Sequence, residues 1–183
     1  MRILGIEHSR RVYLADFVLY GMAVTGLALF LALAAPAAQR WDLLGWVLLG
    51  LAAWTAVEYG VHRFVMHGLQ PFARWHAEHH ARPQGYICSP TVFSASLFAV
   101  LVFAPMWVGA GLWRASALTL GLVGGYLAYG IVHHAVHHWP VDYAWLRRRR
   151  LWHAMHHHRQ PPQRFGVSSG FWDRVFGTAG VPR

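Results

Sequence analysis

The sequence is short of cysteine, of lysine and of acidic residues, and each shortage has a consequence. Its only cysteine, Cys88, rules out a disulfide bond within the chain. Lysine is absent, so all 16 basic residues are arginine, and seven acidic residues leave a formal net charge of +9. The 183 residues also lack a glycine-rich nucleotide loop and a low-complexity linker, and their length predicts one domain over residues 1–183.

Charged residues are missing altogether from four long stretches, where the apolar residues, 56% of the chain, are concentrated. Each stretch approaches the ~17–25 residues that cross a bilayer as a helix, once the second is extended into its flanking residues. We therefore expect an all-α integral membrane protein with four transmembrane helices in two hairpins. The four stretches are residues 17–35, 43–57, 83–113 and 115–132.

Proline and glycine predict where these helices bend and touch. Pro105 is expected to kink the third helix or to break it into a re-entrant pair. Gly21 and Gly26 in the first helix, and Gly121 and Gly125 in the fourth, stand at spacings that let helices approach closely. We expect both helices to pack against their neighbours at these glycines.

The arginines are placed asymmetrically with respect to these helices. Four crossings put the loops around residues 39–40 and Arg114 on one side of the membrane, and fourteen of the sixteen arginines on the other. The positive-inside rule then predicts cytoplasmic N- and C-termini, and this placement argues against a nucleic-acid partner. The run 147–150 fits the same bias, as a segment that contacts anionic lipid or, alternatively, holds a substrate headgroup. The lysine-free, arginine- and alanine-rich composition indicates a bacterial inner membrane.

Histidine is abundant, with 14 residues, and all but His8 fall into four clusters. The second transmembrane helix ends at the first cluster and the fourth helix ends at the third cluster. All four histidine clusters are therefore expected on the cytoplasmic face. Residues at i, i+3 and i+4 share one face of a helix, so the second and fourth clusters each predict a helix that presents three imidazoles to a shared centre. The clusters read HRFVMH at 62–67, HAEHH at 76–80, HHAVHH at 133–138 and HAMHHH at 153–158.

The first cluster has a different spacing. His62 and His67 are five residues apart, which is about 140° around an ideal helix. We expect the helix to fray before Gly68, so that the two side chains reach a common site from the helix and from its end. His133 and His137 in the third cluster form an i, i+4 pair on one helical face.

So many imidazoles on one face indicate metal binding, because they would repel one another when protonated and lose hydrogen bonds when neutral. Imidazole suits Zn, Cu, Fe and Ni, and there are more ligands than one ion of ordinary coordination number can use, which favours two ions. A metal transporter or sensor would need polar residues along the helices, and a haem carrier would need histidine pairs inside the bilayer. A zinc-binding relative without catalytic activity stays open as an alternative.

The order HxxxxH, HxxHH, HxxxH and HxxHH, followed by FGVSSGFWDRVFGT at 165–178, resembles the fatty acid hydroxylase and sterol desaturase superfamily over residues 41–178. The resemblance implies a cytoplasmic histidine-rich helical cap, made from residues 62–89 and 133–183, that holds a dimetal centre. It leaves no assigned role for the extra residues His134, His138 and His158. The implied metal ligands are His62, His67, His76, His79, His80, His133, His137, His153, His156 and His157.

The resemblance further implies a membrane-bound hydroxylase with two iron ions, zinc being the alternative metal in the isolated protein, and O2 as co-substrate. The expected substrate is a membrane lipid, most of all the acyl chain of a fatty acid or acyl lipid. The segment HRFVMHG at 62–68 is similar to carotenoid hydroxylases, so a carotenoid ring hydroxylase is one alternative. A sterol or lipid desaturase of the same superfamily is another.

Neutral imidazoles leave two divalent ions without compensating charge, so nearby acids are expected to contribute. Glu58 lies four residues before His62 on the same helical face, and Asp173 lies in the C-terminal motif; both are predicted to accept hydrogen bonds from metal-bound histidines. Some members of the superfamily carry a fused cytochrome-b5 domain, for which this sequence leaves no room. We therefore expect a separate electron donor, a ferredoxin or a cytochrome-b5-like protein with its reductase, and make no prediction of the oligomeric state.

Overall fold

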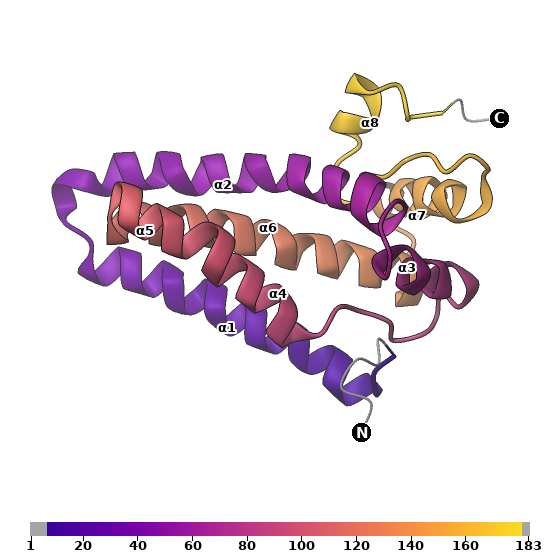
Figure 1. Ribbon diagram of the computed structural model, residues 1–183, viewed down its shortest axis with the longest axis horizontal. Helices are drawn as coiled ribbons and strands as arrows, with labels where there is room; N and C mark the ends of the chain where they lie inside the picture. The colour runs from indigo at the N-terminus through magenta and orange to yellow at the C-terminus, as the bar shows by residue number, and fades with distance from the viewer. Residues whose placement is uncertain (1–6, 181–183) are drawn as a thin grey trace. The chain divides into compact units, whose positions relative to one another are not determined.

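The computed structural model describes residues 7–180, and helices make up nearly all of their regular structure (Figure 1). These residues include no β-strand, only an isolated antiparallel bridge between Glu7 and Ile87. The all-α prediction is confirmed, whereas the chain ends, predicted to be cytoplasmic, lie outside the described residues. In chain order the helices are α1 (Arg10–Ala34), the 3-10 helix η1 (Ala37–Gln39), α2 (Arg40–Gly60), the π-helix η2 (Val61–Met66), α3 (Phe72–Ala81), α4 (Thr91–Leu97), the π-helix η3 (Phe98–Phe103), α5 (Ala104–Ala110), α6 (Leu112–His138), α7 (Ala144–His158) and α8 (Phe171–Val175).

Four helical stretches are long and apolar enough to cross a membrane, which confirms the prediction of a multi-pass membrane protein. The first begins well before its charge-free stretch, because Ser9 caps the helix by accepting a hydrogen bond from the backbone N–H of Val12 at 3.4 Å. Asp16, which this helix therefore includes, accepts a hydrogen bond from the Thr91 hydroxyl at 2.6 Å. The four stretches are Arg10–Ala34, Ala37–Met66, Thr91–Ala110 and Leu112–His138.

The chain forms two units, of which the first contains residues 7–54 and 86–127. In this unit α2 and α6 approach closely at Gly50 and Gly121, where a Cβ atom on either residue would overlap the backbone of the other helix. Gly125 lies equally close to the side chain of Trp54. The glycines of α1, at positions 21 and 26, have no atom within 4 Å of such a Cβ. Close packing at glycine is therefore confirmed for α6 and wrong for α1.

Pro105 does not break the third membrane-spanning helix. The π-helix η3 precedes it, and α5 continues to Ala110, after which Gly111 ends the helix with a φ of 85°. A proline removes one backbone donor and crowds the carbonyl four residues earlier, and a wider π turn accommodates both effects. The predicted re-entrant pair is wrong because the helix absorbs the proline in this way.

The second unit contains residues 55–85 and 128–180 of the described chain. It comprises the last turns of α2 and α6 together with η2, α3, α7 and α8 (Figure 1). A buried apolar contact joins α6 to α7 through Ala135, Val136 and Leu146. Every histidine cluster of the sequence lies in this unit.

The arginine run 147–150 contributes to this contact. Arg150 donates hydrogen bonds to the carbonyl oxygens of Trp139 and Val141, just beyond the end of α6, at 2.8 and 3.2 Å. Carbonyl groups at the end of a helix have no partner within that helix, so Arg150 supplies one. Arg147, by contrast, is exposed and pairs with Asp142 at 3.2 Å.

Candidate metal centre

The first histidine pair is held by a π-helix and by the residue that caps its end. The α-helix α2 stops at Gly60 and continues as η2 from Val61 to Met66. A π-helix is closed by hydrogen bonds between residues five apart, so it brings residues i and i+5 close together. The imidazole centroids of His62 and His67 are accordingly 5.4 Å apart. The HxxxxH spacing, which does not fit an α-helix, fits this turn. The helix stops before Gly68 as predicted, with His67 as its C-cap, but it ends in a π turn instead of fraying.

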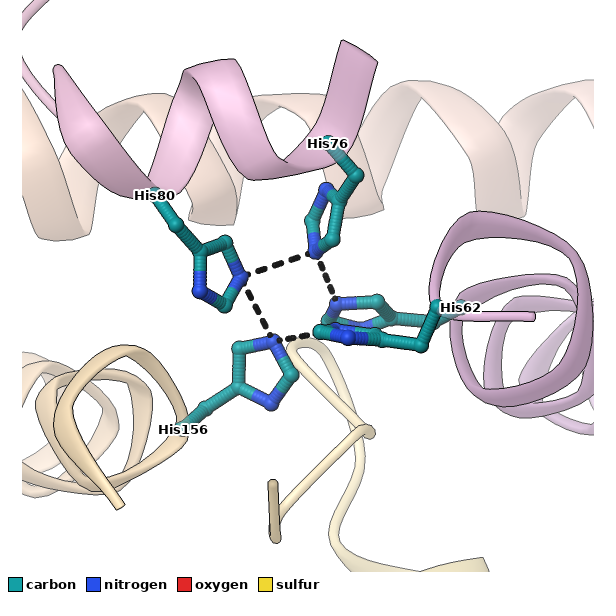
Figure 2. Close-up of side chains that lie close together, drawn as sticks. His62, His76, His80 and His156 are labelled. Carbon is teal, nitrogen blue, oxygen red and sulfur yellow. Dashed lines mark hydrogen bonds between the residues drawn. The ribbon is translucent and has the colours of Figure 1, made fainter. Parts of the chain in front are cut away.

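Five histidines bring one nitrogen each to within 4.8 Å of one another, and we call them group one. The shortest separations join Nε2 atoms: 3.0 Å for His62 and His76, 2.9 Å for His76 and His80, and 3.1 Å for His80 and His156. Figure 2 shows these four rings pointing towards one another, with His76 and His80 on one helix and His62 and His156 on two others. The fifth member, His67, places its Nε2 3.1 Å from that of His156.

Four more histidines, which we call group two, also hold one nitrogen each within 4.8 Å of the others: His79, His133, His137 and His153. The Nε2 atoms of His79 and His133 are 3.1 Å apart, and those of His137 and His153 are 2.8 Å apart. His157 lies beside this group, with its Nε2 3.0 Å from that of His153. The structure thus brings together all ten histidines that were predicted as ligands.

Each of the two histidine-rich helices contributes to both groups. On α3, His76 and His80 belong to group one, whereas His79 belongs to group two. On α7, His156 belongs to group one, whereas His153 belongs to group two. Consecutive residues of a helix are rotated by about 100°, so neighbours in such a stripe diverge enough to reach two centres. The three imidazoles of each helix, predicted to face a shared centre, are thus divided between two histidine groups.

In group one, backbone carbonyls fix the outer nitrogens of two rings. His62 Nδ1–H donates to the carbonyl oxygen of Phe165 at 2.5 Å, and His156 Nδ1–H donates to that of Gln163 at 2.9 Å. These bonds place the proton on Nδ1, so the Nε2 lone pair of each ring points into group one. The sequence gives no signal for such acceptors, because every residue carries a carbonyl.

The outer nitrogens of group two have other surroundings. The Nδ1 atoms of His79, His153 and His157 are buried, and none has a hydrogen-bond partner within residues 7–180. A ligating histidine normally donates its second N–H to an acceptor, which fixes the ring and makes it a better ligand. Group one is therefore the more firmly oriented of the two.

Asp173 holds the loop that supplies the Phe165 carbonyl. Its carboxylate is 1% exposed and accepts the backbone N–H groups of Phe165 and Gly166, one on each oxygen, at 2.8 and 2.9 Å. One oxygen also accepts the hydroxyl of Thr178 at 2.8 Å. The acid thus positions His62 through the backbone of Phe165 instead of accepting its N–H directly.

Glu58 holds the next part of the same loop. Its carboxylate is 4% exposed and accepts the backbone N–H groups of Val167 and Ser168 on one oxygen, at 2.6 and 2.8 Å. The other oxygen accepts the Ser168 hydroxyl. Among the described residues, neither acid bonds to a histidine, so the structure places both one step further from the rings than predicted.

Burial keeps the imidazoles neutral. It lowers the pKa of His79 to about 3 and that of His80 to about 4, and neighbouring histidines add to both shifts. Burial and the neighbouring rings likewise lower the pKa values of His76, His153 and His156. Only the neutral ring can ligate a metal, so these residues are held in the ligating state at neutral pH.

Apart from His157, which lies beside group two, four histidines lie outside both groups. His134 and His138 stack along α6 with ring centroids 4.6 Å apart. His158 is exposed at the end of α7, and the Nε2 atom of His8 lies 3.3 Å from the carbonyl oxygen of Cys88. The extra histidines of the third and fourth clusters are therefore separate from the convergent nitrogens.

The donor set fits two metal ions. A histidine nitrogen binds zinc at about 2.0–2.1 Å, so two nitrogens at right angles on one ion are about 3 Å apart. The closest Nε2 separations, 2.8 Å for His137 and His153 and 2.9 Å for His76 and His80, match this spacing in both groups. The imidazole donors suit Zn, Cu, Fe and Ni alike and do not choose among them.

Four membrane-spanning helices and two histidine groups define a multi-pass membrane protein of the histidine-rich, metal-binding class. A family model described as fatty acid hydroxylase matches residues 47–178. The chain belongs to the fatty acid hydroxylase family.

Curated relatives agree with this assignment. The chain is 31% identical over 156 residues to the ceramide very long chain fatty acid hydroxylase scs7 of Schizosaccharomyces pombe, covering 73% of this chain and 42% of that protein. It is 32% identical over 144 residues to the dihydroceramide fatty acyl 2-hydroxylase FAH2 of Arabidopsis thaliana, covering 72% of this chain and 59% of that protein. The chain therefore spans between about two fifths and three fifths of the length of these relatives.

A solved structure shares the fold. It is described as full-length scs7p with only the hydroxylase domain visible, and it superimposes with a TM-score of 0.74 at 26% identity. The match covers 97% of this chain and 70% of that one. The chain thus shares its fold with a structure described as a hydroxylase domain.

Proposed function

We propose that the protein is a membrane-bound, O2-dependent hydroxylase that acts on the acyl chain of a lipid, with one iron ion at each histidine group. The observation that supports this most is the convergence of nine histidine rings in two groups, with His157 beside the second, at Nε2 separations close to 3 Å. Bound iron would supply the activation of O2 that attack on an unreactive C–H bond requires.

The protein's own residues prepare these sites. Group one would hold the first ion, and group two with His157 would hold the second; zinc accepts the same ligands and is the alternative metal in isolated protein. The Phe165 and Gln163 carbonyls keep the protons of His62 and His156 on Nδ1 and so aim their Nε2 atoms inward. Burial, complete for some rings and partial for others, favours their unprotonated state.

The names of the relatives support the substrate class. They are called ceramide fatty acid hydroxylase and dihydroceramide fatty acyl 2-hydroxylase, which favours an acyl chain, and its 2-position, over a carotenoid ring. The same names favour hydroxylation over desaturation. We infer that the protein adds one hydroxyl group to an acyl chain near its carbonyl end.

The arginine asymmetry supports a cytoplasmic site in a bacterial inner membrane. Under that orientation, an acyl chain reaches the histidines from the bilayer without being transferred through water. Because α2 and α6 each run through both units, we propose that residues 1–183 work as one domain, with 62–89 and 133–183 as its cap.

The test is expression in a bacterial host that also makes a carotenoid, followed by mass spectrometry of the extracted lipids, with His156→Ala as the control. We expect acyl lipids heavier by one oxygen atom only with the unaltered protein. Hydroxylated carotenoid or a desaturated acyl chain would refute the proposed reaction. A second assay gives purified, iron-loaded protein lipid, O2 and ascorbate with a redox mediator, an electron source that requires no partner protein. Absence of product in this assay would also refute the proposed reaction.

A further inference from the structure

One surface of the second unit gathers arginine side chains around a single indole ring. The guanidinium carbons of Arg148, Arg149 and Arg164 lie 4.7, 5.0 and 4.8 Å from the ring centroid of Trp152. The charge of Arg174 also repels those of Arg149 and Arg164. Each cation is attracted to the ring, but the cations repel one another. We call these four arginines and Trp152 the arginine face.

The described chain neutralises the arginine face only in part, because Glu58 attracts Arg149 and Asp173 attracts Arg149 and Arg164. The carboxylates of Asp42, Glu78 and Asp142 form ion pairs with other arginines. Glu58 and Asp173, which lie nearer, are buried and accept backbone N–H groups of the loop. Within residues 7–180, the arginine face therefore presents positive charge without a paired carboxylate.

This charge is accessible to a partner. Arg148 and Arg174 are exposed, and Arg149 and Trp152 are partly exposed, whereas Arg164 is buried beneath them. Arginine and tryptophan are enriched where proteins recognise one another, and complementary charge speeds their encounter. The chemistry of this surface selects a partner with an acidic face.

The arginine face is joined to group one through three consecutive residues. Arg164 lies between Gln163 and Phe165, whose carbonyl oxygens accept the Nδ1–H groups of His156 and His62. Its φ of 58° is a left-handed conformation that is uncommon outside glycine. This turn directs both flanking carbonyls to the histidines while the arginine side chain lies against Trp152. A single hydrogen bond thus separates the backbone of this surface from each of two rings of group one.

Group two is equally near along the chain. Trp152 directly precedes His153, whose Nε2 lies 2.8 Å from that of His137. A protein docked on the arginine face would therefore stand next to both groups at once. An anionic bilayer would also be attracted by these arginines. A lipid headgroup does not exchange electrons with the histidine groups, however, so the short links from the arginine face to these groups would serve it no purpose.

We propose that the arginine face is the docking site of an acidic one-electron donor protein, an iron–sulfur or small haem protein. This inference rests on the proposed function, in which each turnover consumes O2, two electrons and two protons. One oxygen atom enters the C–H bond as a hydroxyl group, and the other leaves as water. Two donor molecules, each oxidised by one electron, supply the two electrons in succession.

The first test measures binding of a soluble plant-type ferredoxin and, separately, of a soluble cytochrome b5 domain to the iron-loaded protein in nanodiscs of neutral lipid. The variant Arg148→Glu/Arg174→Glu reverses two exposed charges outside the histidine groups. We expect binding of at least one donor to weaken by about tenfold or more and to lose much of its salt dependence. Arg148→Lys/Arg174→Lys should keep the binding of the unaltered protein.

A matched control reverses the same number of charges elsewhere. Arg11→Glu/Arg40→Glu alters two exposed arginines of the first unit near helix N-termini, where an acid is well tolerated. This variant should bind the donor as the unaltered protein does. If both double variants weaken donor binding equally, the effect is one of net charge, and the docking site is overturned. Failure of both donors to bind the unaltered protein would also overturn it.

Product formation distinguishes this inference from the proposed function. With ascorbate and a mediator, Arg148→Glu/Arg174→Glu should form product as fast as the unaltered protein, whereas with the protein donor it should be slower. Absence of product from the unaltered protein with every electron source would refute the proposed function. The arginine face would be assigned to the membrane instead if Arg148→Glu/Arg174→Glu bound the donor normally but no longer bound vesicles of anionic phospholipid.

Discussion

Asp173→Asn tests whether the loop beside group one depends on the hydrogen bonds of this residue, because asparagine has the same shape but one acceptor oxygen fewer. One oxygen of Asp173 accepts the Phe165 N–H and the Thr178 hydroxyl, each at 2.8 Å, and the other accepts the Gly166 N–H at 2.9 Å. In either orientation of the amide, its NH2 group meets a backbone N–H. One buried donor is then left without a partner, which costs about 1–3 kcal/mol.

Glu58→Gln is the matched comparison, because Glu58 distributes its bonds differently. One oxygen accepts both backbone N–H groups, those of Val167 and Ser168. The other meets only the Ser168 hydroxyl, which can rotate and accept a hydrogen bond from an amide NH2. Glutamine therefore keeps an acceptor for both backbone donors, and we expect a loss of stability within about 1 kcal/mol.

Two measurements check this pair of variants: thermal unfolding of the metal-free protein in detergent, and competition for the metal between the loaded protein and a chelator. Asp173→Asn should lower the unfolding midpoint and weaken metal binding by about 10–100-fold, because Phe165 then positions His62 less well. Glu58→Gln should change both much less. Identical behaviour of the two variants would refute the assigned hydrogen-bond pattern.

His79→Ala and His156→Ala should each lower the metal content found by elemental analysis and abolish turnover, whereas His8→Ala should do neither; retained activity in both ligand variants would contradict the ligand assignment. The metal-free protein should lose thermal stability as the pH falls below ~6.5, because unfolded histidines then take up protons while burial holds the pKa of His79 at about 3 in the folded state. An unfolding midpoint that stays constant between neutral and mildly acidic pH would contradict this expectation. Gly121→Ala should destabilise the protein by about 1–3 kcal/mol through overlap with α2, whereas Gly21→Ala, with no atom within 4 Å, should leave the unfolding midpoint unchanged.

The features that sequence could predict are those written in local patterns. Charge-free stretches locate the four membrane-spanning helices, since hydropathy depends on neighbouring residues alone. Histidine spacing predicts the four clusters, and the resemblance to the superfamily implies which ten of their rings converge. Sequence patterns fail where the backbone departs from an α-helix. His62 and His67 are brought together by the π-helix η2, and Pro105 comes just after the π-helix η3.

The division of the rings between two groups could not be predicted, because it depends on how helices pack. His79 and His80 are adjacent on α3. The Nε2 atom of His79 nevertheless lies 3.1 Å from that of His133 on α6, whereas the Nε2 atom of His80 lies 3.1 Å from that of His156 on α7. Helical periodicity predicts which side chains share a stripe, but not which neighbour each of them meets. The carboxylate of Glu58 illustrates the same limit, since its partners, Val167 and Ser168, are more than a hundred residues further along the chain.

The C-terminal motif FGVSSGFWD contains no histidine, and its place in the metal centre follows from its backbone. Phe165 contributes a carbonyl to His62, and Gly166 must lack a side chain, because a Cβ there would overlap the Ser169 carbonyl and lie 3.0 Å from Asp173 Oδ2. A side chain at position 166 would therefore displace the carboxylate that holds Phe165. The motif is thus a rigid acceptor for a ligand on a distant helix, so a change at Gly166 should weaken the metal site without removing any ligand.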